Sequence, residues 1–269
     1  MINLIKAREY FEKYCSNYDI NHPRIKLKII HMQHVAKNSK KIAELLELDQ
    51  DNIELAELIG LLHDLGRFDQ WKFYGTFSDK LSIDHGQKSV EILFGDKEIR
   101  NFIEDDEYDA IIYKAINNHS KLEIEKGLSN IENLHCKIIR DADNLDIFRG
   151  LLQDKIEDYT HFGSPDISKE ILSSEFVCDF KKENVLLYSK AKTDMDIMVA
   201  IIAHIYAISF PETLKIIMEN DYINCFVKKI NAQDNYTREK LNEISEYAMN
   251  YIIRKINQNE KVQGKERKF

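Results

Sequence analysis

Four segments with helical periodicity each place an ionisable residue on the face that carries their apolar residues. Residues at positions i, i+3, i+4 and i+7 share one face of a helix. By this spacing His31, His63, His119 and Asp141 fall on apolar stripes of four different segments, and Asp64 directly follows His63. A buried charge is costly unless it is paired or binds a metal ion. Several such residues converging from separate helices therefore predict a metal site.

The apolar neighbours of these residues recur at regular intervals. They are Leu27, Ile30 and Val35 for His31, then Ala56, Ile59 and Leu62 for His63, then Ile112, Ala115 and Ile116 for His119, and finally Leu134, Ile138 and Leu145 for Asp141. A single histidine on such a face is more often a hydrogen-bonded core residue than a ligand. No matching set of inward Arg or Lys residues is evident, whereas a divalent cation would neutralise the group. Imidazole and carboxylate ligands without a nearby cysteine suit Zn, Fe, Mn, Ni or Co rather than a thiolate-rich zinc site.

Three strings in the sequence carry a resemblance to a known family. They are HMQHVAKNSKKIAELL from His31, LIGLLHDLGRF from Leu58 and KIIRDADNLD from Lys137. A bare His-Asp pair is common in proteins. His-Asp-Leu-Gly-Arg after an apolar helix, with the other two strings in order, is much more specific. Over about residues 25–150 the chain resembles the HD-domain superfamily of metal-dependent phosphohydrolases.

The resemblance implies a set of metal ligands. His31, His63, Asp64 and Asp141 stand at the four core positions, and Asp64 is the residue expected to bridge when two metal ions are present. The cofactor would be Mn, Fe, Ni, Co, Zn or Mg, with one or two ions per chain. Further ligands for a second ion come next in the sequence.

His85 and His119 stand where two-metal HD phosphodiesterases carry those extra ligands. His85 could equally be an ordinary surface histidine at the start of a helix. For His119, which extends an apolar stripe, that reading is weaker. Asp143, Asn144 and Asp146 could contribute further contacts, or could simply form a solvated helix face.

The implied reaction is hydrolysis of a small phosphomonoester or phosphodiester, with a nucleotide as the first choice, by attack of a metal-bound hydroxide. Asp64 and Arg67 would be the catalytic residues, with the planar guanidinium of Arg67 holding a phosphate. Arg67 could instead be a cation at a helix end. The sequence contains no Gly-Tyr-Pro motif, so the cyclic dinucleotide phosphodiesterase branch is not supported.

Two other functions fit the same residues. HD-type scaffolds also host di-iron oxygenases, which would use a similar set of histidines and aspartates. A non-catalytic ligand-sensing HD module is the third hypothesis. We disfavour it because degenerate members are expected to lose ligands, and all four core positions are filled here.

The composition predicts an all-α protein. Among 269 residues there are only nine Gly and three Pro, with 43% hydrophobic and 31% charged residues. Turn-rich β folds need more turn residues. We expect one HD-like helical domain over residues 1–269, with its core at about 25–150 and a helical extension at about 151–260. Residues 66–82 are expected to form a loop after a helix capped by Gly66, and residues 175–190 could form one short β-hairpin.

The formal net charge of −8 argues against a nucleic acid polymer or an anionic membrane surface as partner. A small phosphorylated substrate remains compatible, because a bound metal can dominate the field of a site. The four cysteines form no C-x-x-C pair, and the first residues contain no apolar core of signal-peptide length. These features predict a cytoplasmic protein. They leave open whether it forms a homodimer.

Overall fold

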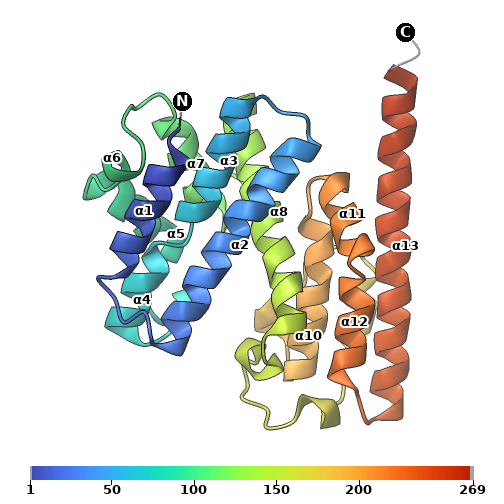
Figure 1. Ribbon diagram of the computed structural model, residues 1–269. Helices are drawn as coiled ribbons and strands as arrows, with labels where there is room; N and C mark the ends of the chain where they lie inside the picture. The colour runs from blue at the N-terminus through green and yellow to red at the C-terminus, as the bar shows by residue number, and fades with distance from the viewer. Residues whose placement is uncertain (1, 267–269) are drawn as a thin grey trace. The chain divides into compact units, whose positions relative to one another are not determined.

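The structure, a computed structural model, describes residues 2–266, and it is helical with no strand in that range (Figure 1). The predicted all-α class is therefore confirmed. The chain divides into two compact units, residues 1–146 and 147–269. That residues 1–269 form one domain with a helical extension at about 151–260 stays a prediction, and the second unit begins close to the start of that extension. All residues of the candidate site belong to the first unit.

The first unit is made of short and medium helices joined by turns. They are α1 (Leu4–Cys15), α2 (Pro23–Leu45), α3 (Gln50–Leu62), α4 (Gly66–Tyr74), a 3₁₀ turn (Asp79–Leu81), α5 (His85–Val90), a π turn (Glu91–Gly95), α6 (Ile99–Phe102), α7 (Asp109–Asn118) and α8 (Asn130–Gln153), which runs past the boundary at 146. Several starts are capped by side chains. Asp49 accepts a hydrogen bond from the Asn52 amide, and Asp84 accepts one from the Gln87 amide. Pro23 starts α2 rather than interrupting a helix, because proline fits the first helical position.

Helix α2 carries His31, α3 directly precedes His63, and these two helices pack closely together. A Cβ on Gly60 would lie 2.7 Å from the Cα atom of Ala36, so only glycine lets the two backbones approach this far. The buried side of α2 includes Met32, Val35 and Ala36, whereas Ile30 is 39% exposed. The stripe that we drew for His31 is thus correct for Val35 and wrong for Ile30.

Residues 66–82 are largely helical, whereas the sequence predicted a loop. Gly66 does not cap α3 but begins α4, and Gly75 ends α4 in the left-handed conformation at φ 65°. Glycine adopts that conformation without steric cost, which makes Gly75 the true C-terminal signal. The remaining loop from Gly75 to Asp84 returns the chain to α5 and contains the 3₁₀ turn.

The second unit contains a long C-terminal helix beside two shorter ones. Its elements are two 3₁₀ turns (Ile156–Tyr159 and Ile167–Lys169), α9 (Ser174–Phe180), a 3₁₀ turn (Tyr188–Lys190), α10 (Asp194–Ile202), a 3₁₀ turn (Ala203–Ala207), α11 (Pro211–Glu219), α12 (Tyr222–Ile230) and α13 (Asn235–Glu266). Both α11 and α12 contact α13, as Figure 1 shows. Every residue of α10 is buried, including Asp194 and Asp196. Their carboxylates accept hydrogen bonds from backbone amides, as buried acids must.

The β-hairpin at residues 175–190 is wrong. Its first half is α9, and the buried side chains Phe176, Val177 and Phe180 follow the i, i+1, i+4 spacing of a helix. Alternation, which a half-buried strand requires, is absent from this stretch. The residues after α9 return through turns to the 3₁₀ turn at Tyr188.

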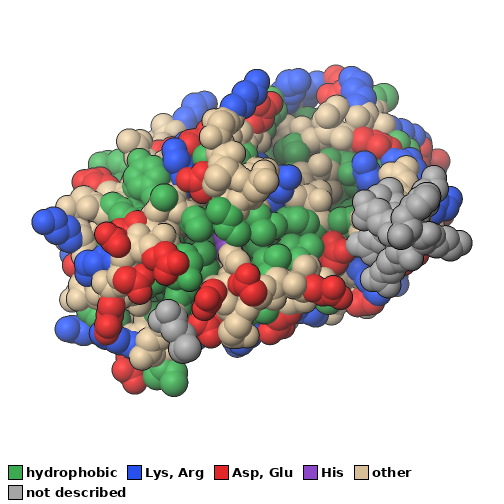
Figure 2. All heavy atoms as spheres, turned by 90° about the horizontal axis from the view of Figure 1, so that it is seen from above, with side chains coloured by type: hydrophobic (Ala, Val, Ile, Leu, Met, Phe, Trp, Pro, Cys, Tyr) green, Lys and Arg blue, Asp and Glu red, His purple; other side chains and the backbone are tan. Residues whose placement is uncertain are grey.

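The mean hydropathy of the sequence is −0.44. None of the helices in residues 2–266 combines the length and the apolar character that a membrane span requires. On the face drawn in Figure 2, hydrophobic, acidic and basic side chains all reach the surface. Histidine is almost completely hidden on this face.

Gly66 fixes the turn that carries Asp64 against α5, and replacing it should destabilise the first unit. Its amide donates to Ser89 Oγ at 2.9 Å, and a Cβ there would meet the backbone oxygen of His85 and, at 2.8 Å, the backbone nitrogen of Ser89. We expect Gly66→Ala to lower the free energy of unfolding by about 1–3 kcal/mol, as other overpacking substitutions do. Urea denaturation would measure the loss. Gly95→Ala is the control, because its nearest contact would be a side-chain carbon at 3.5 Å; equal stability of the two variants would contradict this account.

Candidate metal centre

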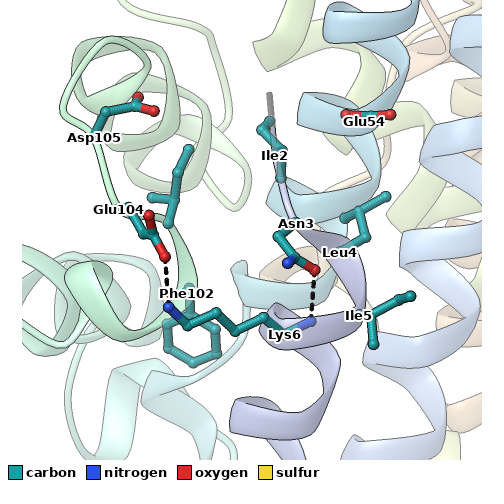
Figure 3. A pocket seen from close by; sticks show the side chains of 10 residues that line it. Ile2, Asn3, Leu4, Ile5, Lys6, Glu54, Phe102, Glu104 and Asp105 are labelled. Atoms are coloured by element: carbon teal, nitrogen blue, oxygen red, sulfur yellow. Dashed lines mark hydrogen bonds and ion pairs between the residues drawn. The ribbon is translucent and has the colours of Figure 1, made fainter.

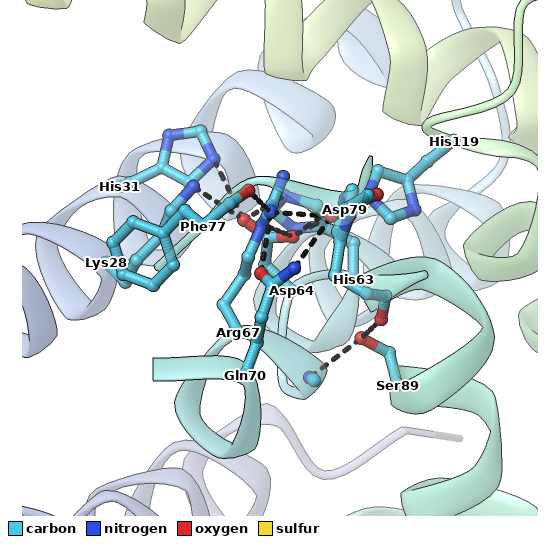
Figure 4. Close-up of polar contacts among 12 residues, drawn as sticks. Lys28, His31, His63, Asp64, Arg67, Gln70, Phe77, Asp79, Ser89 and His119 are labelled. Carbon is cyan, nitrogen blue, oxygen red and sulfur yellow. Dashed lines mark hydrogen bonds and ion pairs between the residues drawn. The ribbon is translucent and has the colours of Figure 1, made fainter. Parts of the chain in front are cut away.

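Four histidines and two aspartates from five segments of the first unit meet at one place, and Figure 4 labels His31, His63, Asp64 and His119 among them. They are His31 on α2, His63 and Asp64 in the turn between α3 and α4, His85 at the start of α5, His119 directly after α7, and Asp143 on α8. These residues form three overlapping groups, and within each group one potential ligand atom per residue lies within 4.8 Å of the others. The sequence prediction that separate helices converge on a metal site is consistent with this geometry.

Asp64 lies at the centre because each of its oxygens faces a different pair of histidines. Its Oδ2 is 3.7 Å from the Nε2 atoms of both His31 and His63. Its Oδ1 is 3.5 Å from His85 Nε2 and 3.6 Å from His119 Nε2. One carboxylate is therefore shared by two imidazole pairs, which is the arrangement of a bridging ligand between two ions.

Asp143 completes the group on the Oδ2 side. Its Oδ1 lies 3.2 Å from His31 Nε2 and 4.0 Å from His63 Nε2. Two ligands bonded to one ion at about 2.1 Å are separated by about 3.0 Å at neighbouring positions and about 4.2 Å at opposite ones. The distances given above around Asp64 Oδ2 and around Asp64 Oδ1 fall in this range. The side chains therefore fit divalent ions without rearrangement of the backbone.

Each of the four imidazoles is oriented through its other nitrogen. His31 Nδ1 lies 2.7 Å from Asp146 Oδ2, and His85 Nδ1 lies 2.6 Å from Asp79 Oδ2. The Nδ1 atoms of His63 and His119 lie 2.9 and 2.7 Å from backbone oxygens. Nδ1–H donating to an acceptor leaves the lone pair on Nε2, and this is how proteins usually orient a metal-binding histidine.

His63 and His119 are placed by the same local device. Each directly follows a helix, and its ring bonds to the carbonyl three residues earlier, that of Gly60 or Ile116. Carbonyls in the last turn of a helix lack an intrahelical partner, so an imidazole N–H at this position satisfies one of them. The negative end of the helix dipole also favours a cation nearby. Two helix ends therefore direct both a ligand and a favourable field at the same centre.

The second pair of histidines presents a specific reason to expect a cation. His85 Nε2 and His119 Nε2 are 3.1 Å apart. Since each ring donates through Nδ1, two lone pairs face each other with no hydrogen between them. Two acceptors at this distance repel each other unless a positive charge lies beside both. A metal ion bound to His85, His119 and Asp64 Oδ1 would remove that repulsion.

Unsatisfied atoms point to the same conclusion. Within the described residues His63 Nε2 and Asp64 Oδ1 are buried and have no hydrogen-bond partner. Buried polar atoms without a partner are rare and costly. Each of these two atoms faces one of the two groups, so the donor set fits a cation in each group. Imidazole-rich ligands favour Mn, Fe, Co, Ni or Zn over Mg.

Burial keeps two of the rings neutral. It lowers the pKa of His63 to about 3 and also lowers the pKa of His85. For Asp79, burial acts to raise the pKa, but His85, Arg67 and Gln70 together outweigh it and lower the pKa to about 2. Neutral imidazole and ionised carboxylate are the protonation states that a metal requires.

The ion pairs of the site act on the remaining groups. Burial would raise the pKa of Asp64, but Lys28 and His63 outweigh it and hold the pKa well below its ordinary value. Burial and Lys28 act to lower the pKa of His31, whereas its hydrogen bonds to Asp143 and Asp146 raise it overall. The ordinary state of Asp64 is thus a buried anion among cations and polar rings.

Two cations lie at the edge of the centre. Lys28 Nζ is 2.9 Å from Asp64 Oδ2, and Arg67 Nε is 3.5 Å from Asp64 Oδ1. Arg67 is held in place by its Nη1, which donates to Gln70 Oε1 at 2.7 Å, to the Phe77 carbonyl at 2.6 Å and to Asp79 Oδ1 at 3.0 Å. Our expectation that no inward Lys or Arg accompanies these residues is therefore wrong.

For the last ligand, which we expected to be Asp141, the described residues offer Asp143 in the groups with ligand geometry. Asp141 is fully buried, as its place on the apolar stripe suggested, but among the described residues it belongs to none of the groups with ligand geometry. Asp143 takes that position instead. Residues two apart on an α-helix are rotated by about 200° around its axis, so only one of these carboxylates can face His31 and His63.

The structure brings together the other ligand candidates, His31, His63, Asp64, His85 and His119. Sequence reasoning missed four supporting residues, which are Lys28, Gln70, Phe77 and Asp79. Lys28 precedes His31 by one helical turn, a spacing that could have shown that both side chains lie on one face. The other three lie in or beside the segment 66–82, which we had interpreted as a loop, and no local pattern connects them to the histidines.

A second hollow lies elsewhere on the first unit and differs in character. It has a volume of about 550 Å³ and is lined by residues 2–6, Glu54 and residues 102–105. Figure 3 shows its lining, with Lys6 Nζ bound to Glu104 at 2.7 Å. Its lining combines apolar residues with acidic ones and with Asn3 and Lys6, and it contains no histidine. This hollow therefore lacks the imidazole ligands of the centre around Asp64.

The sequence was compared with family models and with known proteins. The sequence model of the HD domain matches residues 29–147, a span that contains all six residues of the centre. Searches of curated proteins and of solved structures found no match. Residues 29–147 therefore form an HD domain, as the three motif strings suggested.

Metal binding can test whether Asp143 or Asp141 is the ligand from α8. We expect Asp143→Asn to weaken Mn²⁺ binding at the His31–His63 group by at least about tenfold, because the ion loses an anionic ligand. Asp141→Asn should leave the stoichiometry and affinity unchanged. Isothermal titration of the metal-stripped variants with Mn²⁺ measures both. If Asp141→Asn lost the ion while Asp143→Asn kept it, the assignment would return to Asp141.

The number of ions can be tested separately. We expect the chain to bind two Mn²⁺ ions and the double variant His85→Ala/His119→Ala to bind one, because the Oδ1 group would lose both imidazoles. Elemental analysis of the saturated and desalted proteins gives the count. His161→Ala is the control, since His161 is exposed and lies in the second unit. One ion per chain in both the wild type and the double variant would make His85 and His119 bystanders.

Proposed function

We propose that this protein is a metal-dependent phosphohydrolase that cleaves a small phosphomonoester or phosphodiester, with a nucleotide as the first substrate class to examine. The observation that carries the proposal is the position of Asp64. Its two oxygens face two separate imidazole pairs at 3.5–3.7 Å, as a carboxylate shared by two ions would. Membership of the HD-domain superfamily supports a hydrolytic role for such a centre.

The chain's residues would hold the ions and keep their own side chains oriented. When bound, divalent ions lower the pKa of a water molecule and offset the negative charge that develops on phosphoryl oxygens. His31, His63, His85 and His119 hold the ions through Nε2, and their Nδ1 hydrogen bonds keep the rings from rotating. This preorganisation lets the site act without reorganising during the reaction.

Arg67 would bind the phosphate of the substrate. Its Nη1 is occupied by three acceptors, among them the carbonyl of Phe77 and the carboxylate of Asp79, while its buried Nε has no hydrogen-bond partner among the described residues. A guanidinium fixed in this way can offer its remaining N–H groups to a phosphoryl oxygen at no cost in side-chain entropy. Asp79 also orients His85, so the same carboxylate positions a metal ligand and a phosphate-binding side chain.

A di-iron oxygenase remains the alternative, because four imidazoles and two carboxylates also suit iron. The two functions differ in what they consume. A phosphohydrolase releases inorganic phosphate or a phosphomonoester without oxygen, whereas an oxygenase needs Fe²⁺ and takes up dioxygen. A non-catalytic sensing module would bind metal and turn over neither.

The test is a panel of phosphate esters assayed with added Mn, Ni, Co and Mg, beside oxygen uptake by anaerobically purified protein. We expect hydrolysis that is lost in Asp64→Asn, since the shared ligand then carries no charge. In Arg67→Lys metal content should be retained while kcat/KM falls by about 10–100-fold, because a planar fork becomes a point charge. Oxygen uptake without phosphate release would overturn the proposal, and full activity in Asp64→Asn would remove the site from the mechanism.

A further inference from the structure

Lys28 is the cation closest to the shared carboxylate and has no role in the scheme above. It lies one turn before His31 on α2, and its ammonium is 2.9 Å from Asp64 Oδ2. The same oxygen faces the Nε2 atoms of His31 and His63 at 3.7 Å. Figure 4 shows Lys28 and His31 pointing from one helix toward Asp64. The ammonium thus occupies the side of Asp64 on which the first ion would bind.

The ion pair of Lys28 with Asp64 stabilises the buried carboxylate when no metal ion is bound. The side chain of Asp64 is only 3% exposed, and a buried carboxylate without a counter-charge is strongly destabilising. Lys28 supplies that charge from the rim, with 18% of its side chain exposed and its Nζ 5.6 Å from the ring centroid of Phe77. In the described part of the chain its ammonium has one hydrogen bond, to Asp64.

A divalent ion would compete with Lys28 for Asp64 Oδ2. Once the ion binds Asp64 Oδ2, the carboxylate no longer needs Lys28, and two cations on one oxygen repel each other. Arg67 cannot respond in the same way, because three acceptors hold its Nη1. Lys28 has a flexible stem and reaches solvent. An anionic oxygen placed beside the ion would attract the released ammonium.

We propose that Lys28 is the internal counter-cation of Asp64 in the metal-free protein and becomes a binding residue for the anionic group of the substrate once metal is bound. This inference rests on the proposed function for the identity of the anion. Its consequence is a coupling between ligands: Lys28 weakens metal binding when no anion is present and strengthens binding of an anion when metal is present.

The first part of the test uses no substrate. Lys28→Met retains the length and apolar body of the side chain but removes the charge. We expect a lower melting temperature for the metal-stripped variant than for wild type, and a Kd for Mn²⁺ that is about tenfold lower, because the competing charge is gone. Lys37→Met is the matched control, since Lys37 is an exposed residue of the same helix, and it should change neither quantity.

The second part titrates the Mn²⁺-loaded proteins with inorganic phosphate. We expect Lys28→Met to raise the Kd for phosphate about tenfold, as expected for loss of one charge-assisted hydrogen bond. Lys28→Arg keeps the charge and should bind both Mn²⁺ and phosphate much as wild type does. It also serves as the second variant if Lys28→Met does not fold.

The outcomes separate this inference from the proposed function. Unchanged or weaker Mn²⁺ binding in Lys28→Met would overturn the counter-cation role, and unchanged phosphate binding would overturn the anion-binding role. A shift in Lys28→Arg as large as that in Lys28→Met would also overturn both, because charge would not be the cause. If wild type hydrolyses no phosphate ester but the Mn²⁺ and phosphate shifts occur, the proposed function fails and the role of Lys28 stands.

Discussion

The buried carboxylate of Asp64 is the constraint on which the first unit depends. It is 2% exposed, it is ionised, and one of its oxygens has no hydrogen-bond partner in the described residues. Such a group is tolerated only where positive or polar partners surround it. Here the partners are an ammonium, a guanidinium and four imidazoles, brought from segments that are far apart in the chain. The helices of this unit are arranged so that these partners can meet.

The supporting structure around that carboxylate is made of ordinary helix features. Two helix ends orient His63 and His119 through carbonyls that would otherwise be unsatisfied. A Ser129–Glu132 capping box starts the helix that carries Asp143 and Asp146. An Asp84 cap places His85 at the first position of α5. Local rules of helix termination therefore account for most of the geometry, and no strained backbone is needed at the ligands.

The loop from Gly75 to Asp84 has a different function in the structure. Gln70, which is fully buried, donates to Asp79, Ser82 and the Ile83 carbonyl and so fixes the path of this loop. Asp79 is thereby held between His85 and Arg67. The carboxylate thus connects His85, at the centre of the histidine cluster, to Arg67 at its edge. A change in this loop would alter both together, which makes the segment a part of the site rather than a connection between helices.

Much of this protein could be predicted from local sequence properties. The scarcity of Gly and Pro indicated helices, and period-3.6 spacing placed His31, His63 and His119 toward the interior, because those properties depend on residues close in the chain. Local properties could not decide whether Asp141 or Asp143 faces the imidazoles. They also could not predict the ion pair of Lys28 with Asp64 or the position of Asp79 beside His85. Each depends on how one helix is rotated against another or how a loop folds back over it. Burial alone did not distinguish them, since Asp141 is also buried; only packing between distant segments decided which carboxylate faces the imidazoles.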